Sequence, residues 1–482
     1  MWMIDNTVFE TVKDPNTDPK RTMPKIKSVS ERIGGYDQIE ETYTEEEALN
    51  EAARCLKCPT HWCQKECPAG VPVTDFIAKT RAKDYEGAYE LIRSASMLPE
   101  ICSRVCPQEK QCQSNCTRGI NTQSVGIGRL ERFVVEQHYA SGIPEKRSPS
   151  TGKKVAVIGS GPSGLSAAQR LTELGHAVTV YEKADRPGGL LEYGIPNMKL
   201  EKGVVERKIS SLEAQGVTFR TGVSVGEDVS AESLKADYDA VILAIGTGNA
   251  RSLNPEGASG TDGIVPAVTF LTNATKGYLN ADPSVMAKDK HVVIVGGGDT
   301  GNDCVGTSIR QGALSVTQIE MMPQNTEIPY LIAVHPAREK EKKHDFSQEE
   351  CERMFGDPHI YQSTVSAVRA DETGRICAAT IVSLDAAYDK MNRLTLTRIS
   401  GSEKEIPCGL LIVAAGFLGP QQDLLAAFGV ETTARSNAAA DHYATNVPKV
   451  YACGDCRSGQ SLVVKAMCDG RDCANAVHAE LK

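Results

Sequence analysis

The stretch KKVAVIGSGPSGLSAAQRLTELGHAVTVYE, residues 153–182, contains a complete strand–turn–helix–strand pattern. An apolar run leads into Gly159, Gly161 and Gly164, a helical run follows, and a second apolar run ends at Glu182. The first glycine of such a motif allows a tight turn, the second lets the backbone approach a pyrophosphate, and the third lets helix and strand pack closely. The acid at the end of the second strand can accept a hydrogen bond from a ribose hydroxyl. The stretch therefore predicts a Rossmann-like dinucleotide-binding unit.

The same pattern returns in KHVVIVGGGDTGNDCVGTSIRQGALSVTQIE, residues 290–320. Gly296, Gly298 and Gly301 take the three glycine positions, and Glu320 ends the second strand. The repeat indicates an internal duplication. We expect one unit to bind a flavin nucleotide and the other a nicotinamide nucleotide.

A third segment, VPKVYACGDCRSGQSLVVKAM at 447–467, predicts a short strand, a polar turn at Gly454-Asp455 and a helix. In flavoproteins with two dinucleotide units, such a strand returns to the first unit, and its Asp binds the ribityl chain of the flavin. We therefore expect the nicotinamide unit to be inserted within the flavin unit. The segments 238–248 and 408–420 are the expected hinges.

Composition and charge of the whole chain indicate the cellular compartment in which the protein is expected. It has 482 residues, a net charge of −9 and no basic block, which argues against a nucleic-acid partner. The N-terminus lacks the pattern of a secretory signal, and the longest apolar run is shorter than the ~18 residues that suggest a membrane span. We therefore expect a cytoplasmic protein without a membrane partner, where disulfides rarely persist.

Sixteen cysteines are present, and those between residues 55 and 116 form two quartets. Each quartet contains a Cys-Pro step, which also ends the cysteine runs of bacterial ferredoxins. A structural zinc site prefers two paired Cys-x₂₋₄-Cys knuckles, and only one x₂ pair occurs here. The spacing favours iron–sulfur over zinc and leaves open which cysteines are ligands. The quartets are Cys55, Cys58, Cys63, Cys67 and Cys102, Cys106, Cys112, Cys116.

Two further features of the sequence, a glutamate and a Cys-x-x-Cys motif, each have more than one interpretation. Glu131, in a predicted helix, is by pattern alone a solvated carboxylate. Cys453 and Cys456 form a Cys-x-x-Cys motif, which a redox-active disulfide would explain. We favour a coincidence, because the Gly-Asp turn already accounts for the spacing.

The predicted fold class is α/β. Two Rossmann-like domains, with the nicotinamide domain inserted in the FAD domain, follow an α-helical domain with two [4Fe–4S] clusters. A capping box at Thr44 and Glu47 and helical runs at 73–92 and 126–140 support the helical domain. The expected limits are 1–147 for the helical domain with an extended N-terminal arm, 148–275 and 408–482 for the FAD domain, and 276–407 for the NAD(P)H domain.

Several segments together resemble the family of glutamate synthase small (β) subunits over essentially the whole length. They include CLKCP…CQKECP, RVCPQEKQC, GIGRLERF, GGLLEYGIP and ATNVPKVYACGDCRSGQSLVV. The wider family includes the N-terminal half of dihydropyrimidine dehydrogenase and the large subunit of a ferredoxin-bifurcating transhydrogenase.

The resemblance implies a crossed set of cluster ligands, in which Glu131 replaces a fourth cysteine and Cys102 is not a ligand. It also implies which residues contact the nucleotides, and it implies no acid or base side chain for the hydride step on FAD. The implied sets are Cys55, Cys58, Cys63 and Cys116 for one cluster; Cys67, Cys106, Cys112 and Glu131 for the other; Gly159, Gly161, Gly164, Glu182, Gly189, Leu190 and Asp455 for FAD; and Gly296, Gly297, Gly298, Asp299, Thr300 and Gly301 for the nicotinamide nucleotide.

The implied function is electron entry into glutamate synthase. NADPH reduces FAD, the clusters carry the electrons onward, and a large (α) subunit makes L-glutamate from L-glutamine and 2-oxoglutarate. Two alternatives remain at this point: the same module feeding another acceptor, as in a ferredoxin-linked transhydrogenase or a pyrimidine reductase, and a non-catalytic zinc-bound scaffold.

One position departs from the expectation of NADPH. Glu320 stands where a 2′-phosphate would be recognised, and the next arginine is Arg338. A carboxylate there suits the bare ribose of NADH. The resemblance nonetheless favours NADPH, with NADH as the alternative.

Overall fold

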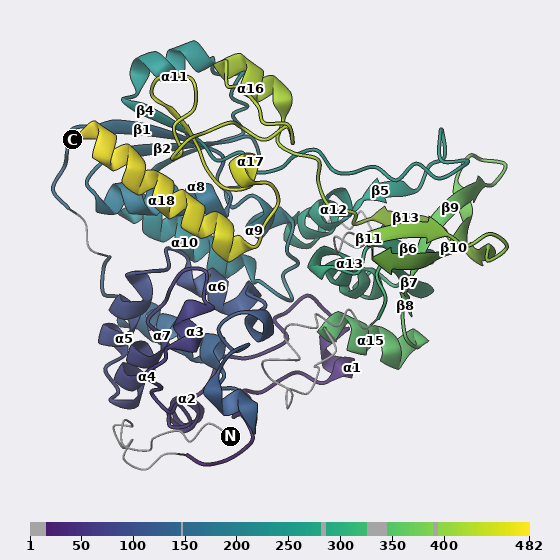
Figure 1. Cartoon of the computed structure of the whole chain (residues 1–482), viewed down its shortest axis with the longest axis horizontal. Helices are drawn as coiled ribbons and strands as arrows, with labels where there is room; N and C mark the ends of the chain where they lie inside the picture. The colour runs from purple at the N-terminus through teal and green to yellow at the C-terminus, as the bar shows by residue number, and fades with distance from the viewer. Residues whose placement is uncertain (1–15, 146–147, 281–285, 325–344, 389–393) are drawn as a thin grey trace.

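The structure is a computed structural model that describes residues 16–145, 148–280, 286–324, 345–388 and 394–482. A helical module at the N-terminal end lies beneath the first of two α/β modules, the second lies to the side, and a pair of extended segments joins the two α/β modules (Figure 1). The elements of the helical module are α1 (Val29–Arg32), α2 (Glu45–Ala52), α3 (Trp62–Lys65), α4 (Val73–Arg81), α5 (Tyr85–Arg93), α6 (Pro99–Val105) and α7 (Ile127–Ser141), with 3₁₀ turns at Gln108–Lys110 and Thr117–Ile120.

The local signals for helices in this module are confirmed, with one difference. Thr44 and Glu47 form the predicted capping box at the start of α2. The predicted run at 73–92 is divided into α4 and α5, because Lys83 adopts a left-handed backbone with φ 59° and Asp84 caps the next helix. The Asp84 carboxylate accepts a hydrogen bond from the Gly87 N–H at 2.9 Å.

The first α/β module contains a parallel five-stranded sheet in the order β14-β4-β1-β2-β3. Side chains of β1 alternate between two cores: Val155 and Val157 face α8, α10 and α18, whereas Ala156 and Ile158 face α11 and α16. The elements are β1 (Lys154–Ile158), α8 (Pro162–Glu173), β2 (Ala177–Glu182), α9 (Leu190–Tyr193), α10 (Lys202–Ala214), β3 (Thr218–Thr221), α11 (Ala231–Asp237), β4 (Ala240–Leu243), α16 (Gln422–Phe428), β14 (Val450–Ala452), α17 (Asp455–Ser458) and α18 (Val463–Leu481).

The second α/β module contains another parallel sheet, in the order β5-β13-β6-β7-β8. Helices α12, α13 and α15 cover one face, and strands β9 and β10 of an antiparallel sheet pack against the other. The elements are β5 (Ile264–Pro266), α12 (Ala267–Asn280), β6 (His291–Val295), α13 (Asp299–Arg310), β7 (Ser315–Ile319), α15 (Phe346–Phe355), β8 (His359–Ile360), β9 (Ser363–Ala370), β10 (Ile376–Tyr388), β11 (Leu394–Arg398), β12 (Lys404–Pro407) and β13 (Leu410–Val413).

The strand pairing confirms the insertion and corrects its limits. β14 pairs in parallel with β4, so the late strand does return to the first sheet. The expected limits 276–407 omitted β5 and β13, which are both strands of the second sheet. Two segments cross between the modules and pair with each other, through Asn249 N–H to the Gly419 carbonyl at 3.1 Å and Arg251 N–H to the Gly416 carbonyl at 2.8 Å.

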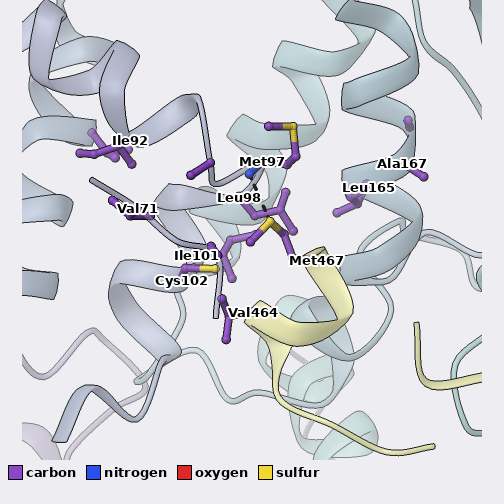
Figure 2. Packing of buried hydrophobic residues seen from close by; sticks show 14 of the residues in the cluster. Val71, Ile92, Met97, Leu98, Ile101, Cys102, Leu165, Ala167, Val464 and Met467 are labelled. Atoms are coloured by element: carbon purple, nitrogen blue, oxygen red, sulfur yellow. Dashed lines mark hydrogen bonds between the residues drawn. The ribbon is translucent and has the colours of Figure 1, made fainter. Parts of the chain in front are cut away.

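A continuous apolar core joins the helical module to the first α/β module. Figure 2 shows Leu98 and Ile101 of the helical module packed with Met467 of α18 and with Leu165 of α8. The Met97 N–H donates to the Met467 sulfur at 3.2 Å. These two modules are therefore one packing unit.

The described part of the N-terminal arm crosses to the second α/β module. Helix α1 lies beside α15, where Arg32 is buried in an ion pair with Glu350, at 3.1 Å from Nε to Oε1 (Figure 1). Arg310 of α13 binds the same carboxylate and also donates to the Gly35 carbonyl at 2.8 Å. The described part of the arm thus contacts its own chain from Asn16 onward, where the Asn16 N–H donates to the Ala53 carbonyl at 3.1 Å.

Candidate functional site

The first glycine loop has the geometry that a dinucleotide requires. Gly159 has φ 97°, and a Cβ there would lie 2.5 Å from the Ala244 carbonyl oxygen. A Cβ on Gly164 would collide with the Gly159 carbonyl oxygen. Gly161, at the start of α8, has open space around its Cβ position. Packing therefore requires the first and third glycines, and the second leaves room at a helix N-terminus, where a phosphate binds favourably.

Glu182 and Gly189 complete the wall around this opening. The Glu182 carboxylate accepts hydrogen bonds from the Ser160 N–H at 3.0 Å and from its hydroxyl at 2.6 Å. Gly189, with φ 56°, precedes α9, and a Cβ there would lie 2.9 Å from the Gly161 Cα. Leu190, the first residue of α9, is exposed. The predicted residues Glu182, Gly189 and Gly161 are thus brought together, and Ser160 is an addition that the motif did not indicate.

Strand β14 delivers Asp455 to the same region. Gly454 has φ 73°, and its Cβ position would collide with the Ser163 side chain in the first turn of α8. The Asp455 carboxylate accepts from the Ser461 hydroxyl at 2.6 Å, and burial raises the pKa of Asp455. The neighbouring motif cysteines, Cys453 and Cys456, are both buried free thiols. The Cys456 thiol donates to the Leu243 carbonyl at 3.2 Å.

The second glycine loop reproduces the first. A Cβ on Gly296, where φ is 130°, would lie 2.4 Å from the Ala414 carbonyl oxygen, and a Cβ on Gly301 would collide with the Gly296 carbonyl oxygen. Gly298 has open space around its Cβ position, and Asp299 and Thr300 are exposed at the start of α13. Gly297 lies against the Glu320 carboxylate.

One cleft of about 940 Å³ connects the modules. The first α/β module contributes Leu190 and Gly194 from the α9 segment, and the second glycine loop contributes Asp299 and Thr300. The helical module contributes Cys106. Leu190, the second glycine loop and one predicted cluster ligand therefore face a common space.

The thiols of the helical module divide into the two predicted groups. The thiols expected to hold the first cluster line one pocket, which Trp62 and Arg118 also line. Burial, together with the neighbouring thiols of the same group, raises the pKa of Cys55 to about 11 and that of Cys63 to about 12. The four residues are Cys55, Cys58, Cys63 and Cys116.

The second group includes Glu131. Burial is the largest cause of the raised pKa of Cys67 and Cys112, and the Cys102 thiol is the largest for Cys106. The Glu131 carboxylate contributes to all three increases, so these thiols lie within its electrostatic reach. Burial, and then the charge of Glu100, raise the pKa of Glu131 to about 8. Glu131 forms no hydrogen bond or ion pair with any described residue. A half-buried carboxylate without a donor fits a cluster iron as its partner, because desolvated charges are normally paired or bound to a metal.

Cys102 occupies a different position. It lies in α6 and is buried in the apolar core (Figure 2), and its thiol is the first cause of the raised pKa of Cys106. Among the described residues, no three His, Cys, Asp or Glu side chains are disposed around a single metal ion. A four-iron cluster needs wider spacing than one ion, because its cube of iron and sulfide lies between the ligands.

The cleft also contains an ionic cluster that the motif reasoning missed. Lys199, which follows the predicted GGLLEYGIP segment, reaches Asp303 of α13 at 2.5 Å and Asp345 at 2.8 Å. Burial raises the pKa of Asp303 to about 6. Sequence alone gives no signal for this contact, because the three residues belong to different elements that meet only in the folded chain.

Two family models match the chain. The model of dihydropyrimidine dehydrogenase domain II, with its 4Fe-4S cluster, matches residues 32–143, and that of pyridine nucleotide-disulphide oxidoreductases matches residues 153–337 and 375–470. The second match alone spans more than half of the chain. The chain is therefore an NAD(P)H-dependent oxidoreductase whose cofactors are FAD and [4Fe–4S] clusters.

Curated relatives match nearly end to end. The glutamate synthase [NADPH] small chain of Bacillus subtilis is 37% identical, with 95% of this chain and 96% of that protein covered. The glutamate synthase [NADH] of Schizosaccharomyces pombe is 36% identical over 98% of this chain, which spans only 23% of that longer protein. Among solved structures, FprA from Mycobacterium tuberculosis has a TM-score of 0.56 at 18% identity, covering 69% of this chain and 85% of that one, and shows the fold alone.

No helix in the described ranges is long and apolar enough to cross a membrane. The zinc-scaffold alternative has no support in these matches, because the helical module matches a 4Fe-4S domain. The thiol groups, the paired glycine loops and the near-complete match to small chains agree with one another. The chain belongs to the glutamate synthase small-chain family.

Proposed function

We propose that this chain is the electron-entry subunit of a glutamate synthase. It takes electrons from NAD(P)H and passes them to a larger partner subunit that forms L-glutamate from L-glutamine and 2-oxoglutarate. The observation that carries the proposal is the shared cleft, in which Leu190, Asp299 and Cys106 represent the three modules. Family membership supports glutamate as the product.

We assign the site residues module by module. The open helix N-terminus at Gly161 receives the diphosphate of FAD, and that at Gly298 receives the diphosphate of the nicotinamide nucleotide. The thiol groups around Cys63 and around Glu131 each hold one cluster. The remaining contacts are Gly159, Gly164, Glu182, Gly189, Leu190 and Asp455 for FAD; Gly296, Gly297, Asp299, Thr300 and Gly301 for the nicotinamide nucleotide; Cys55, Cys58 and Cys116 for the first cluster; and Cys67, Cys106 and Cys112 for the second.

The work of the chain itself is positioning. When bound, the nucleotides supply hydride transfer and the clusters supply single-electron transfer. The loops fix the nucleotides through backbone N–H groups, and Asp455 and Ser461 hold a polar edge where β14 meets α8. No side chain donates or removes a proton in the hydride step. The module that contains residues 264–413 is the nicotinamide module, and the sixteen free thiols suit the reducing cytoplasm.

The test is to recover the native complex anaerobically on a tagged copy of this chain. NAD(P)H oxidation is then measured with and without glutamine plus 2-oxoglutarate. Oxidation that requires both substrates, with glutamate as product, supports the proposal. Oxidation only with an artificial dye, despite a co-purified large partner, would assign the module to another acceptor and reject the proposal.

A further inference from the structure

Glu320 has a defined place at the carboxyl end of β7. Its Oε1 accepts a hydrogen bond from the Met322 N–H at 2.9 Å. Its Oε2 lies so close to Gly297 that a Cβ on that glycine would collide with it. One oxygen is thus anchored by the backbone, and the other points across the second glycine loop.

The corresponding acid in the first module is held in the same way. Glu182 Oε1 accepts from the Ala184 N–H at 2.9 Å, two residues along the chain, as Met322 lies two residues after Glu320. Both acids stand at the end of the second strand of their unit, beside the residue that follows the first loop glycine. An acid at this position accepts hydrogen bonds from the hydroxyls of a bare adenosine ribose.

The surroundings of Glu320 supply no compensating positive charge in the described ranges. The residues that follow it, from Met321 to Gln324, are uncharged, and Glu320 forms no ion pair with a described Lys or Arg. A 2′-phosphate on the ribose would place roughly two further negative charges beside the Glu320 carboxylate. Like charges at such a short distance repel each other.

We infer that Glu320 determines the dinucleotide specificity of this chain and that the reductant is NADH, not NADPH. The inference rests on the proposed function only in that it concerns the same nicotinamide site. It departs from the NADPH expected from the resemblance. The curated relatives divide on this point, since those from Bacillus subtilis and Schizosaccharomyces pombe are named for NADPH and NADH respectively.

The first test measures binding without turnover. The full chain, loaded with its cofactors, is titrated calorimetrically with NAD⁺ and separately with NADP⁺ at one ionic strength. We expect NAD⁺ to bind about tenfold more tightly or better, because one unscreened like-charge contact is sufficient for that ratio. Equal binding, or tighter binding of NADP⁺, would overturn the inference and leave the proposed function standing.

Two variants assign the preference to the carboxylate. Glu320→Gln keeps the shape and removes the charge, so it should raise the affinity for NADP⁺ at least about fivefold and weaken that for NAD⁺. Glu431→Gln makes the same change at an exposed site on the first module and should leave the ratio unchanged. If the ratio of NAD⁺ affinity to NADP⁺ affinity were the same in Glu320→Gln as in the native chain, another group would be selecting the nucleotide. Dye-linked kcat/KM for NADH and NADPH gives a second readout that does not depend on the glutamate-forming partner.

Discussion

Glu131 shows how one side chain gains a role from its neighbours. Glu131 lies in α7 next to other charged residues, and from its sequence position alone it is expected to be exposed to solvent. The fold places it within the electrostatic reach of three thiols and gives it no hydrogen-bond donor among the described residues. Burial raises its pKa to about 8, which means that the carboxylate lacks a compensating charge in the protein itself.

We expect Glu131→Ala to remove one cluster and lower the iron content from about eight to about four atoms per chain. Glu131→Gln should retain more iron and raise the reduction potential of that cluster, because a negative charge is lost near it. Iron and acid-labile sulfide assays, with an EPR-monitored redox titration, measure both effects. Cys102→Ala is the matched control and should keep all the iron. Full iron in Glu131→Ala with loss in Cys102→Ala would reverse the assignment.

At the scale of elements, different glycines within each loop serve folding and nucleotide binding. Gly159 and Gly164 are required by close backbone contacts, so their replacement damages the turn itself. Gly161 and Gly298 have negative φ, extended backbone and open space at the Cβ position. A methyl group at either would therefore be accepted by the protein but would occupy the place of a phosphate.

Gly161→Ala should abolish FAD retention, and Gly298→Ala should keep FAD but weaken NAD(P)H binding at least about tenfold, because the methyl group blocks backbone approach. The melting temperature of the cofactor-free chain should change little in both. Flavin absorbance after gel filtration and calorimetric titration measure the two effects. Gly203→Ala, exposed in α10 with open space, is the control and should be neutral or stabilising by about 0.5–1 kcal/mol. Loss of flavin in Gly298→Ala would contradict the division of roles between the loops.

Local patterns predicted the elements well and their pairing less well. The glycine motifs, the capping box at Thr44 and the return of β14 are short-range or motif-borne signals, and the structure confirms them. β13 looked like a strand of the first module from its position, yet it pairs with β5 and β6. An apolar strand of four residues contains no information about which of two parallel sheets it will join. The break at Lys83 was missed because non-glycine residues rarely adopt positive φ.

At the scale of the whole molecule, buried ion pairs are among the contacts that hold the second α/β module to the rest. Lys199, from the first module, forms ion pairs with Asp303 and Asp345 of the second. The three side chains are largely buried and line the same cleft as Leu190 and the second glycine loop. We therefore expect these ion pairs to help set the distance between a bound nicotinamide and the flavin.

Lys199→Met should slow the reduction of FAD by NAD(P)H about tenfold or more, because small errors in placement are costly for hydride transfer. The affinity for the oxidised nucleotide should change less, since Lys199 is not proposed to contact it. Anaerobic stopped-flow measurement of flavin bleaching gives the rate, and calorimetry gives the affinity. Lys199→Arg should restore much of the rate. An affinity loss as large as the rate loss would make Lys199 a binding residue instead.

The helical module and the first α/β module, by contrast, share an apolar core. Leu98 and Ile101 of the helical module are fully buried, and Met467 of α18 is buried against them (Figure 2). Such a core contains no water layer at which the modules could separate. We therefore expect the clusters and the flavin to be lost in one cooperative transition.

Leu98→Ala tests this expectation. The cavity it leaves should cost about 2–5 kcal/mol and lower the melting temperature of both modules together. Cluster absorbance and flavin fluorescence, followed in the same anaerobic heating experiment, should shift by the same amount. Leu418→Ala removes the same atoms from a side chain that is 53% exposed and should leave both signals in place. If the cluster signal moved while the flavin signal did not, the two modules would be separate folding units, and electron transfer between them would rest on a dissociable contact. A common shift would mean that the path from the flavin loops to Cys106 is fixed by the same packing that stabilises the fold.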